Sequence, residues 1–339
     1  MNTKVNKRNQ IFLQSNTVSL TVLFLVLYAL SCGRLDILGP ALLGFVNGGE
    51  ETIVPKDEDG PPAEELGAVT VVFERQGYDS EPDYSASLDA VVFVSDVGGS
   101  KDIWRISLNG AGLTLLTTSL KEETAPVWNT VGNTIAFASD SMGNQDIWLM
   151  SNTGTNLQRL TTDPAEDAMP DFSPDGSQIA FASDRSGNLD IWVIRISSGA
   201  LTRLTEDPED NYRPRWSPDG QRIAYVTRIN NNVSEIRTVT ITGGTVTSVT
   251  QVASENDMPS WSPSGDFLAY TSNRSGNWDL WIQEFGGGIP RLIPPVQATL
   301  DSKFDTGPSW LAGDTGFLFA SSRGGDLDIW SMIFFEPLK

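Results

Sequence analysis

The chain repeats one residue pattern six times. Each unit begins with a proline, has the aspartate of a Ser-Asp pair or a variant of it fourteen residues later, and reaches an Asp-Ile-Trp or a variant six residues after that. In the third unit Pro170 leads to Asp184, Asp190 and Trp192. The starting prolines give periods of 44, 44, 44, 45 and 49 residues; they are Pro82, Pro126, Pro170, Pro214, Pro259 and Pro308. A fixed period in the low forties is typical of units that each form a small sheet and bury its faces only against neighbouring units. Six such units predict an all-β fold, a closed six-bladed β-propeller.

The third unit indicates how the strands of one blade follow one another. Residues 170–173 are expected as a short inner strand, which ends at a Pro-Asp-Gly turn. Small, β-prone residues at 179–182 predict a second strand that is buried between blades. The third strand is expected at 190–194 and the outer strand at 201–205.

The polar hairpin between the second and third strands is interpreted as structural, because it recurs in nearly every unit. Its carboxylates and hydroxyls can accept hydrogen bonds from turn amides, and Asp190 is spaced to bridge to Arg185. The tryptophans of the motif are interpreted as packing between blades and not as a platform for sugars. They are Trp104, Trp148, Trp192, Trp281 and Trp330.

The spacing also predicts how the ring closes. The outer strands begin thirteen residues before the next proline, at Leu113, Leu157, Leu201 and Val246. The same count back from Pro82 reaches Val69, whereas Trp330 is only nine residues from the end of the chain. Residues 68–74 are therefore expected to supply the outer strand of the sixth blade, which leaves no open sheet edge. The propeller is predicted to span residues 68–335.

Composition excludes several kinds of function. The 339 residues include 43 acidic and 23 basic side chains, a net charge of −20 that disfavours nucleic acid and anionic lipid as partners. A basic protein or a divalent cation suits this charge better. The chain has no histidine, which excludes a Ser-His-Asp triad, a Cys-His pair and a histidine-bound zinc. Its single cysteine, Cys32, excludes an intramolecular disulfide.

The N-terminus has the features of an export signal. Lys4, Lys7 and Arg8 precede an apolar stretch from Val18 to Leu30 that is too short to span a membrane comfortably, and Cys32 stands where cleavage is expected. This resembles a bacterial lipoprotein box, so residues 1–31 are predicted to be a lipoprotein signal peptide and Cys32 the lipidated residue. An uncleaved anchor and ordinary secretion remain as alternatives. Residues 32–67 are rich in proline, glycine and acidic residues, which predicts a flexible acidic tether.

The repeat resembles a known family. Trp216 to Gly220 reads Trp-Ser-Pro-Asp-Gly, and Ile179 to Trp192 reads Ile-Ala-Phe-x-Ser-Asp-Arg-x-Gly-Asn-x-Asp-Ile-Trp. Both segments look like the TolB-type, WD-like propeller repeat, and the likeness covers residues 68–335. Such blades occur in the periplasmic protein TolB, in the propellers of prolyl-oligopeptidase-like and tricorn-like proteases, and in other envelope proteins. The chain lacks an α/β domain before the propeller and a hydrolase domain, so the resemblance implies a TolB-like lipoprotein and not TolB itself.

The repeat departs from its pattern in two places. In the fourth unit residues 228–236 replace the Ser-Asp hairpin, and residues 285–308 carry five extra residues before the sixth proline. Departures from a repeat are where a binding function is most readily sought, and simple drift is the alternative explanation.

An acidic residue stands four positions before the proline in four successive units, and two of these positions are followed by a second acid, Glu123 or Asp167. The four residues are Glu122, Glu166, Asp210 and Glu255. Equivalent positions lie on a ring, so these carboxylates are expected to surround one mouth of the channel and to attract a basic partner or Ca²⁺. Two alternatives are a merely solvated rim and carboxylates that cap their own loops.

These observations favour a non-catalytic, monomeric propeller, anchored by lipid to a bacterial cell envelope and facing the periplasm or the exterior. It is expected to bind an envelope protein or peptide on one face, and Ca²⁺ is the one candidate cofactor. The alternative is a calcium-dependent propeller that binds or cleaves glycans, because paired carboxylates among the 43 acidic residues suffice for that chemistry.

Overall fold

The computed structural model describes residues 66–118, 121–250, 254–336 and 338. The predicted signal peptide, Cys32 and all of the predicted tether except its last two residues lie outside the described residues, so these expectations remain predictions. No described helix is both long enough and apolar enough to span a membrane.

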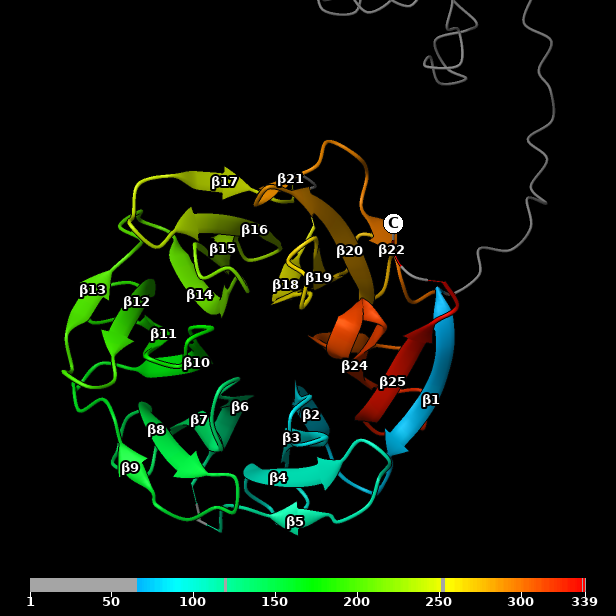
Figure 1. The fold of residues 1–339 in the computed structure, drawn as a ribbon, viewed down its shortest axis with the longest axis horizontal. Helices are drawn as coiled ribbons and strands as arrows, with labels where there is room; N and C mark the ends of the chain where they lie inside the picture. The colour runs from blue at the N-terminus through cyan, green and yellow to red at the C-terminus, as the bar shows by residue number, and fades with distance from the viewer. Residues whose placement is uncertain (1–65, 119–120, 251–253, 337, 339) are drawn as a thin grey trace, which may run out of the picture. The chain divides into compact units, whose positions relative to one another are not determined.

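Six antiparallel sheets surround a central axis, as Figure 1 shows. In blades one to three the chain runs from the axis outward through four strands. Blade one holds β2 (Asp79–Ser85), β3 (Ala90–Ser95), β4 (Asp102–Ser107) and β5 (Thr114–Leu115). Blade two holds β6 (Glu123–Trp128), β7 (Thr134–Ser139), β8 (Asp146–Ser151) and β9 (Gln158–Arg159). Blade three holds β10 (Asp167–Phe172), β11 (Gln178–Ser183), β12 (Asp190–Arg195) and β13 (Leu201–Arg203).

The remaining blades follow the same order with local changes. Blade four holds β14 (Asp210–Trp216), β15 (Arg222–Asn230), β16 (Val233–Thr240) and β17 (Val246–Ser248). Blade five holds β18 (Asn256–Trp261), β19 (Phe267–Ser272), β20 (Asp279–Gly286), β21 (Ile289–Pro290) and β22 (Val296–Gln297). Blade six holds β23 (Asp305–Trp310), β24 (Gly316–Ser321) and β25 (Asp328–Phe334), with the short 3-10 helix η2 (Ala312–Asp314) after β23.

The strand β1 (Gly67–Phe73) closes the ring, and it confirms the prediction made for residues 68–74. It pairs antiparallel with β25, so that Gly67 lies opposite Phe334 and Val71 opposite Trp330. A Cβ atom on Gly67 would lie 2.2 Å from the main-chain oxygen of Ile333, so only glycine allows this approach. Blade six is therefore built from both ends of the propeller.

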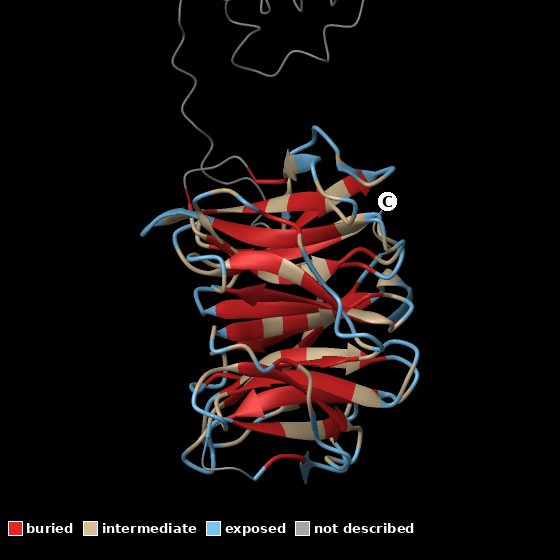
Figure 2. Cartoon of the chain, turned by 90° about the vertical axis from the view of Figure 1, so that its left-hand side faces the viewer, coloured by how far each residue is buried: buried red, intermediate tan, exposed pale blue. Residues whose placement is uncertain are grey.

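The core lies between the blades. Each cluster of buried apolar side chains joins neighbouring blades; one of them combines Ile147 of β8 with Ile179 and Phe181 of β11. The second strand of each blade lies at the centre of this core, and in blade one every residue of β3 is buried. Figure 2 shows the strands as buried bands and the exposed residues mainly in loops at their ends. The motif tryptophans pack against these clusters, as predicted.

All six innermost strands contain a bulge at the residue before the blade proline, where the register slips in each inner pair. The residue there has a φ between 49° and 65°, which is uncommon for residues other than glycine. These residues are Glu81, Ala125, Met169, Arg213, Met258 and Gly307. Sixfold recurrence of this conformation, which is strained in the five residues other than glycine, shows that the bulge belongs to the architecture of the inner ring.

Candidate functional site

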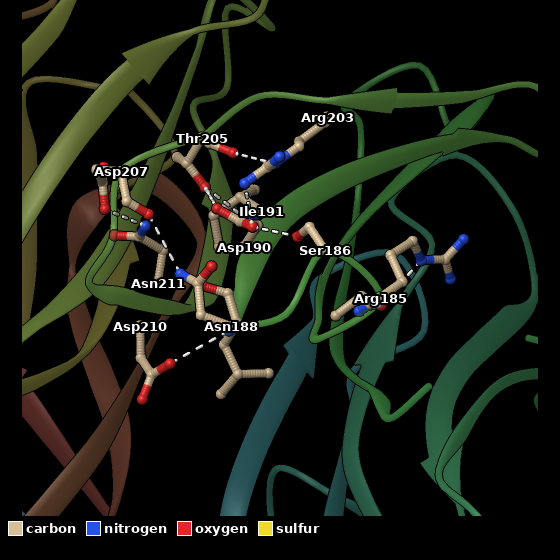
Figure 3. A network of polar contacts seen from close by, with 12 residues as sticks. Arg185, Ser186, Asn188, Asp190, Ile191, Arg203, Thr205, Asp207, Asp210 and Asn211 are labelled. Carbon is tan, nitrogen blue, oxygen red and sulfur yellow. Dashed lines mark hydrogen bonds and ion pairs between the residues drawn. The ribbon is translucent and has the colours of Figure 1, made fainter. Parts of the chain in front are cut away.

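The polar hairpin of blade three is a structural network, which Figure 3 shows. Asp190 is fully buried and accepts hydrogen bonds from Ser186, from Arg203 at 2.7 Å and from Thr205 at 3.1 Å. The side-chain amide of Asn188 donates to the main-chain oxygen of Glu209 at 2.8 Å, in the loop that leads to blade four. The hairpin is thus tied to the outer strand and to the next blade.

Arg185 pairs with Asp167 and not with Asp190, so the pairing expected from the spacing is wrong. Its Nη2 atom lies 2.7 Å from both carboxylate oxygens of Asp167 in β10, whereas the guanidinium that binds Asp190 belongs to Arg203 in β13. Spacing along the sequence cannot show which arginine pairs with which aspartate, because β10 and the hairpin become neighbours only when the sheet forms. Arg185 also lies over the rings of Phe181 and Trp192.

The aspartate of each Ser-Asp pair caps the start of the innermost strand in its own blade. The Oδ1 atoms of Asp96, Asp140 and Asp184 accept hydrogen bonds from the main-chain N–H groups of Tyr78, Glu122 and Glu166 at 2.8 to 3.0 Å. The prediction that these carboxylates satisfy turn amides is confirmed. Two of these hydrogen bonds hold the main chain of Glu122 and Glu166, which belong to the predicted acidic mouth.

The four predicted carboxylates stand at equivalent positions, at or just before the first residue of an innermost strand. We call this end of the propeller the acidic face. Glu166 accepts a hydrogen bond from the main chain of Gln145 at 2.9 Å, and Asp210 accepts one from Leu189 at 3.2 Å. Glu255 accepts one from the side chain of Asn273 at 2.9 Å. Glu122 is half exposed, with Lys101 at 4.0 Å. Three of the four therefore also brace a loop.

Glu123 and Asp167, the acids that follow Glu122 and Glu166 in the sequence, are not exposed on the acidic face. Asp167 is fully buried with Arg185, and Glu123 is 2% exposed and accepts a hydrogen bond from Ser139 at 3.1 Å. Both begin an innermost strand, and the equivalent residues of the other blades are also buried. One position in sequence separates a half-exposed carboxylate from a buried one because successive strand residues point to opposite faces.

The acidic face continues into an aromatic sector at the two positions where the sequence breaks the acidic pattern. Tyr78 and Phe304 occupy the positions of blades one and six that are acidic elsewhere, and they are 56% and 38% exposed. Trp278 packs against Phe304 with ring centroids 6.2 Å apart. The signal was present in the sequence, since both aromatic residues stand four positions before a blade proline.

The irregular blade four forms a cavity of about 430 Å³ at this face. The strands β15 and β16 continue past the usual hairpin position and pair Arg228 with Ser234. Residues of this projecting hairpin and residues of blade five line one space. The cavity is lined by Tyr212, Arg228, Asn230, Asn231, Val233, Ser234, Glu255, Asp257 and Trp278. Burial raises the pKa of Tyr212, so its hydroxyl stays protonated at neutral pH.

The channel beneath the acidic face is narrowed by an ion network, which we call the waist. Arg213 on β14 approaches Glu81 on β2 to 3.4 Å and Asp257 on β18 to 2.9 Å. The first pair joins blades on opposite sides of the ring (Figure 1). Burial lowers the pKa of Arg213, but the attraction of Asp257 and Glu81 outweighs it and raises the pKa. A void of about 20 Å³ remains among these side chains and the neighbouring prolines.

The second departure from the repeat lies elsewhere. Residues 285–308 extend β20, add β21 and place β22 as the outer strand, so the extra residues lie at the outer edge of blade five (Figure 1). They do not contribute to the cavity at blade four. No group of three or more acidic, cysteine or histidine side chains that could hold a metal ion occurs among the described residues. The Ca²⁺ prediction stays untested.

Comparison with known proteins identifies the repeat. A sequence profile of the TolB beta propeller domain family matches residues 119–232 and 209–335. The two ranges overlap and together run from 119 to 335, more than half of the chain. No curated protein matches the chain by sequence.

Solved structures share the fold at low identity. The putative TolB from Agrobacterium tumefaciens has a TM-score of 0.60 and 20% identity over 80% of this chain and 99% of its own. TolB from Acinetobacter baumannii has a TM-score of 0.53 and 18% identity over 79% of this chain, which spans 66% of that protein. An oligogalacturonate lyase from Vibrio parahaemolyticus has a TM-score of 0.57 and 13% identity over 78% and 93% of the two chains. Likeness at this level concerns the fold alone.

Proposed function

Since the chain belongs to the family of TolB beta propeller domains, we propose that it is a non-catalytic propeller that binds a protein or peptide at its acidic face. The observation that carries this proposal is the position of Glu255. It is one of the four carboxylates singled out by the repeat, and it also lines the cavity made where the repeat breaks. A recurring feature of the repeat and a departure from the repeat thus meet at one place.

The chemistry of this face indicates the partner. Glu122, Glu166 and Asp210 supply negative charge over blades two to four, and Tyr78 and Phe304 supply exposed aromatic surface over blades one and six. A partner segment with basic residues and an apolar anchor complements both. Charge at such an interface mainly sets the association rate and the specificity, while an aromatic contact in a cavity contributes most of the affinity.

Neutralising the acidic face is expected to weaken partner binding about tenfold or more and to flatten its dependence on salt. The variant carries Glu122→Gln, Glu166→Gln, Asp210→Asn and Glu255→Gln. A photoactivatable residue at Asn231, on the tip of the blade-four hairpin, reports the partner by crosslinking in the native cell. The same envelope protein should be captured from wild type and lost from the variant.

A matched control neutralises four exposed acids in the turns at the opposite end of the propeller, with Asp89→Asn, Asp175→Asn, Asp219→Asn and Asp266→Asn. It changes the net charge equally and should leave the crosslink intact. Equal crosslinking in both variants would contradict the proposal. Turnover of a glycan or peptide by the wild type, lost on the same four substitutions in the acidic face, would establish the enzymatic alternative instead. Calorimetry with Ca²⁺ on the acidic-face variant and on the control variant tests whether the acidic face binds the cation.

We also propose that the protein is held in a bacterial cell envelope by lipid at Cys32. The basic residues near the N-terminus, the apolar stretch and the position of the cysteine support this. Mass spectrometry of the mature protein should find acylated Cys32 at its N-terminus. Cys32→Ala should release or misprocess the protein, because two or more acyl chains are needed for stable anchoring. Ser31→Ala, which keeps a small residue before the cysteine, is the control. An unchanged membrane fraction of Cys32→Ala would refute lipid anchoring.

A further inference from the structure

The opposite end of the channel opens into a separate cavity of about 510 Å³. Its wall is a ring of aromatic side chains, one from each innermost strand, two residues after the blade proline. They are Tyr84, Trp128, Phe172, Trp216, Trp261 and Trp310. We call this cavity the aromatic funnel. It lies beyond the waist from the acidic face, so it is independent of the function proposed above.

Charged groups stand between these aromatic walls. The side chains one residue after the proline include Asp83 on β2, Asp171 on β10 and Arg215 on β14, all of which line the funnel. Asp171 uses one oxygen to accept from the main chain of Trp216 at 2.6 Å, and its other oxygen lies 3.5 Å from Arg215. Asp83 accepts from the main chain of Trp128 at 2.8 Å. Arg215 thus approaches Asp171 only at an imperfect distance, and its charge also opposes the rise that burial causes in the pKa of Asp83.

The aromatic ring has unsatisfied donors as well. The indole N–H groups of Trp261 and Trp310 donate to the main-chain oxygens of Arg215 and Ser260, at 3.3 and 2.9 Å. The equivalent groups of Trp128 and Trp216 are buried, and neither has an acceptor among the described residues. A buried donor without a partner costs about 1–3 kcal/mol, so an oxygen that reached either indole after a small movement of its side chain would be favourable.

We propose that the aromatic funnel binds an organic cation in which a primary ammonium group and an oxygen acceptor are joined by a short apolar stem. The ammonium would lie between Asp83 and Asp171 and supply the missing positive charge. The stem would pack on the aromatic wall, and the oxygen would accept from an indole N–H. A lysine side chain with its own main-chain carbonyl and a free amino alcohol share this chemistry.

The protonation state of Asp171 provides a second test of this proposal, which is the dependence of ligand affinity on pH. Burial raises the pKa of Asp171 to about 7, with Asp83 adding to the shift and Arg215 opposing it. Among the described residues, these two are the charged groups that line the funnel beside it. The carboxyl is mostly protonated at pH 6 and mostly ionised at pH 8, and only the ionised form attracts an ammonium group. Affinity should therefore rise about tenfold between these pH values, whereas the ammonium ligand itself stays protonated throughout.

Calorimetry with the wild-type protein provides the test. Nα-acetyl-lysine methylamide represents the peptide side chain and 5-aminopentanol the free amine. Two neutral counterparts should not bind: Nα-acetyl-norleucine methylamide, which lacks only the amino group of the lysine compound, and 1,5-pentanediol, which has the same length as 5-aminopentanol. Asp171→Asn should lower the affinity about tenfold or more and abolish the pH dependence. Asp266→Asn, an exposed acid at the same end but outside the funnel, should change neither.

The possible results distinguish a peptide ligand from a free amine, and they also show which results would contradict the proposal. Binding of only one of the two amines assigns the funnel to a peptide or to a free metabolite. Failure of both amines to bind wild type at pH 8, or equal binding of the neutral analogues, would overturn the proposal without any variant that could misfold. Neither result would affect partner capture at the acidic face.

Discussion

A propeller that lacks β1 should melt at least about 10 °C below one that retains it. Six residues of this strand are paired with β25, and Val69 packs against the core between blades five and six. Phe73 lies 5.7 Å from Phe93 of blade one, so the strand also touches the first blade. Lost ladder hydrogen bonds and partly buried side chains sum to about 5 kcal/mol, and each kcal/mol shifts the melting temperature by about 2–4 °C in a domain of this size.

The measurement compares a chain that begins at Leu66 with one that begins at Glu74, by differential scanning calorimetry. A synthetic peptide of residues 66–75 should raise the melting temperature of the shorter chain, and a scrambled peptide should not. The shorter chain is also expected to associate, because β25 would present an unpaired edge. Equal melting temperatures of the two chains would mean that the ring is closed by some pairing other than that of β1 with β25.

Arg185→Ala is expected to lower the free energy of unfolding by about 3–5 kcal/mol at neutral pH. The substitution leaves the fully buried carboxylate of Asp167 without its cation and removes the guanidinium that covers Phe181 and Trp192. A buried charge that loses its partner keeps the cost of leaving water, so the effect exceeds that of an exposed ion pair. Urea denaturation measures it.

Arg195→Ala is the matched control, because Arg195 is exposed on the same blade and should change stability by less than about 0.5 kcal/mol. A double-mutant cycle then distinguishes the two candidate partners of Arg185. Arg185→Ala should couple strongly with Asp167→Asn and only weakly with Asp190→Asn. The reverse pattern would restore the pairing that spacing suggested.

The sequence was sufficient for the fold because the repeat constrains it at every level. The period predicted the number of blades, and counting thirteen residues back from Pro82 located the closing strand within one residue of its observed bounds. Turn residues and β-prone runs fixed the strand order within a blade, since these are local properties. The capping role of Asp96, Asp140 and Asp184 could also be predicted, because a group that recurs in unit after unit usually serves the unit.

Side-chain partners could not be predicted in the same way. Whether Arg185 meets Asp167 or Asp190 depends on which strand lies beside the hairpin, and Glu123 is buried while Glu122 is half exposed because of strand orientation. The waist joins Glu81 to Arg213 across 132 residues and across the ring, and no local pattern records such a distance.

Sequence by itself determined what each blade is and how many there are, because those follow from local preference repeated at a fixed period. Only the tertiary structure decided where the blades become different from one another. The cavity at blade four, the aromatic sector and the aromatic funnel each combine residues from several blades, and closing the ring is what places those residues around one space.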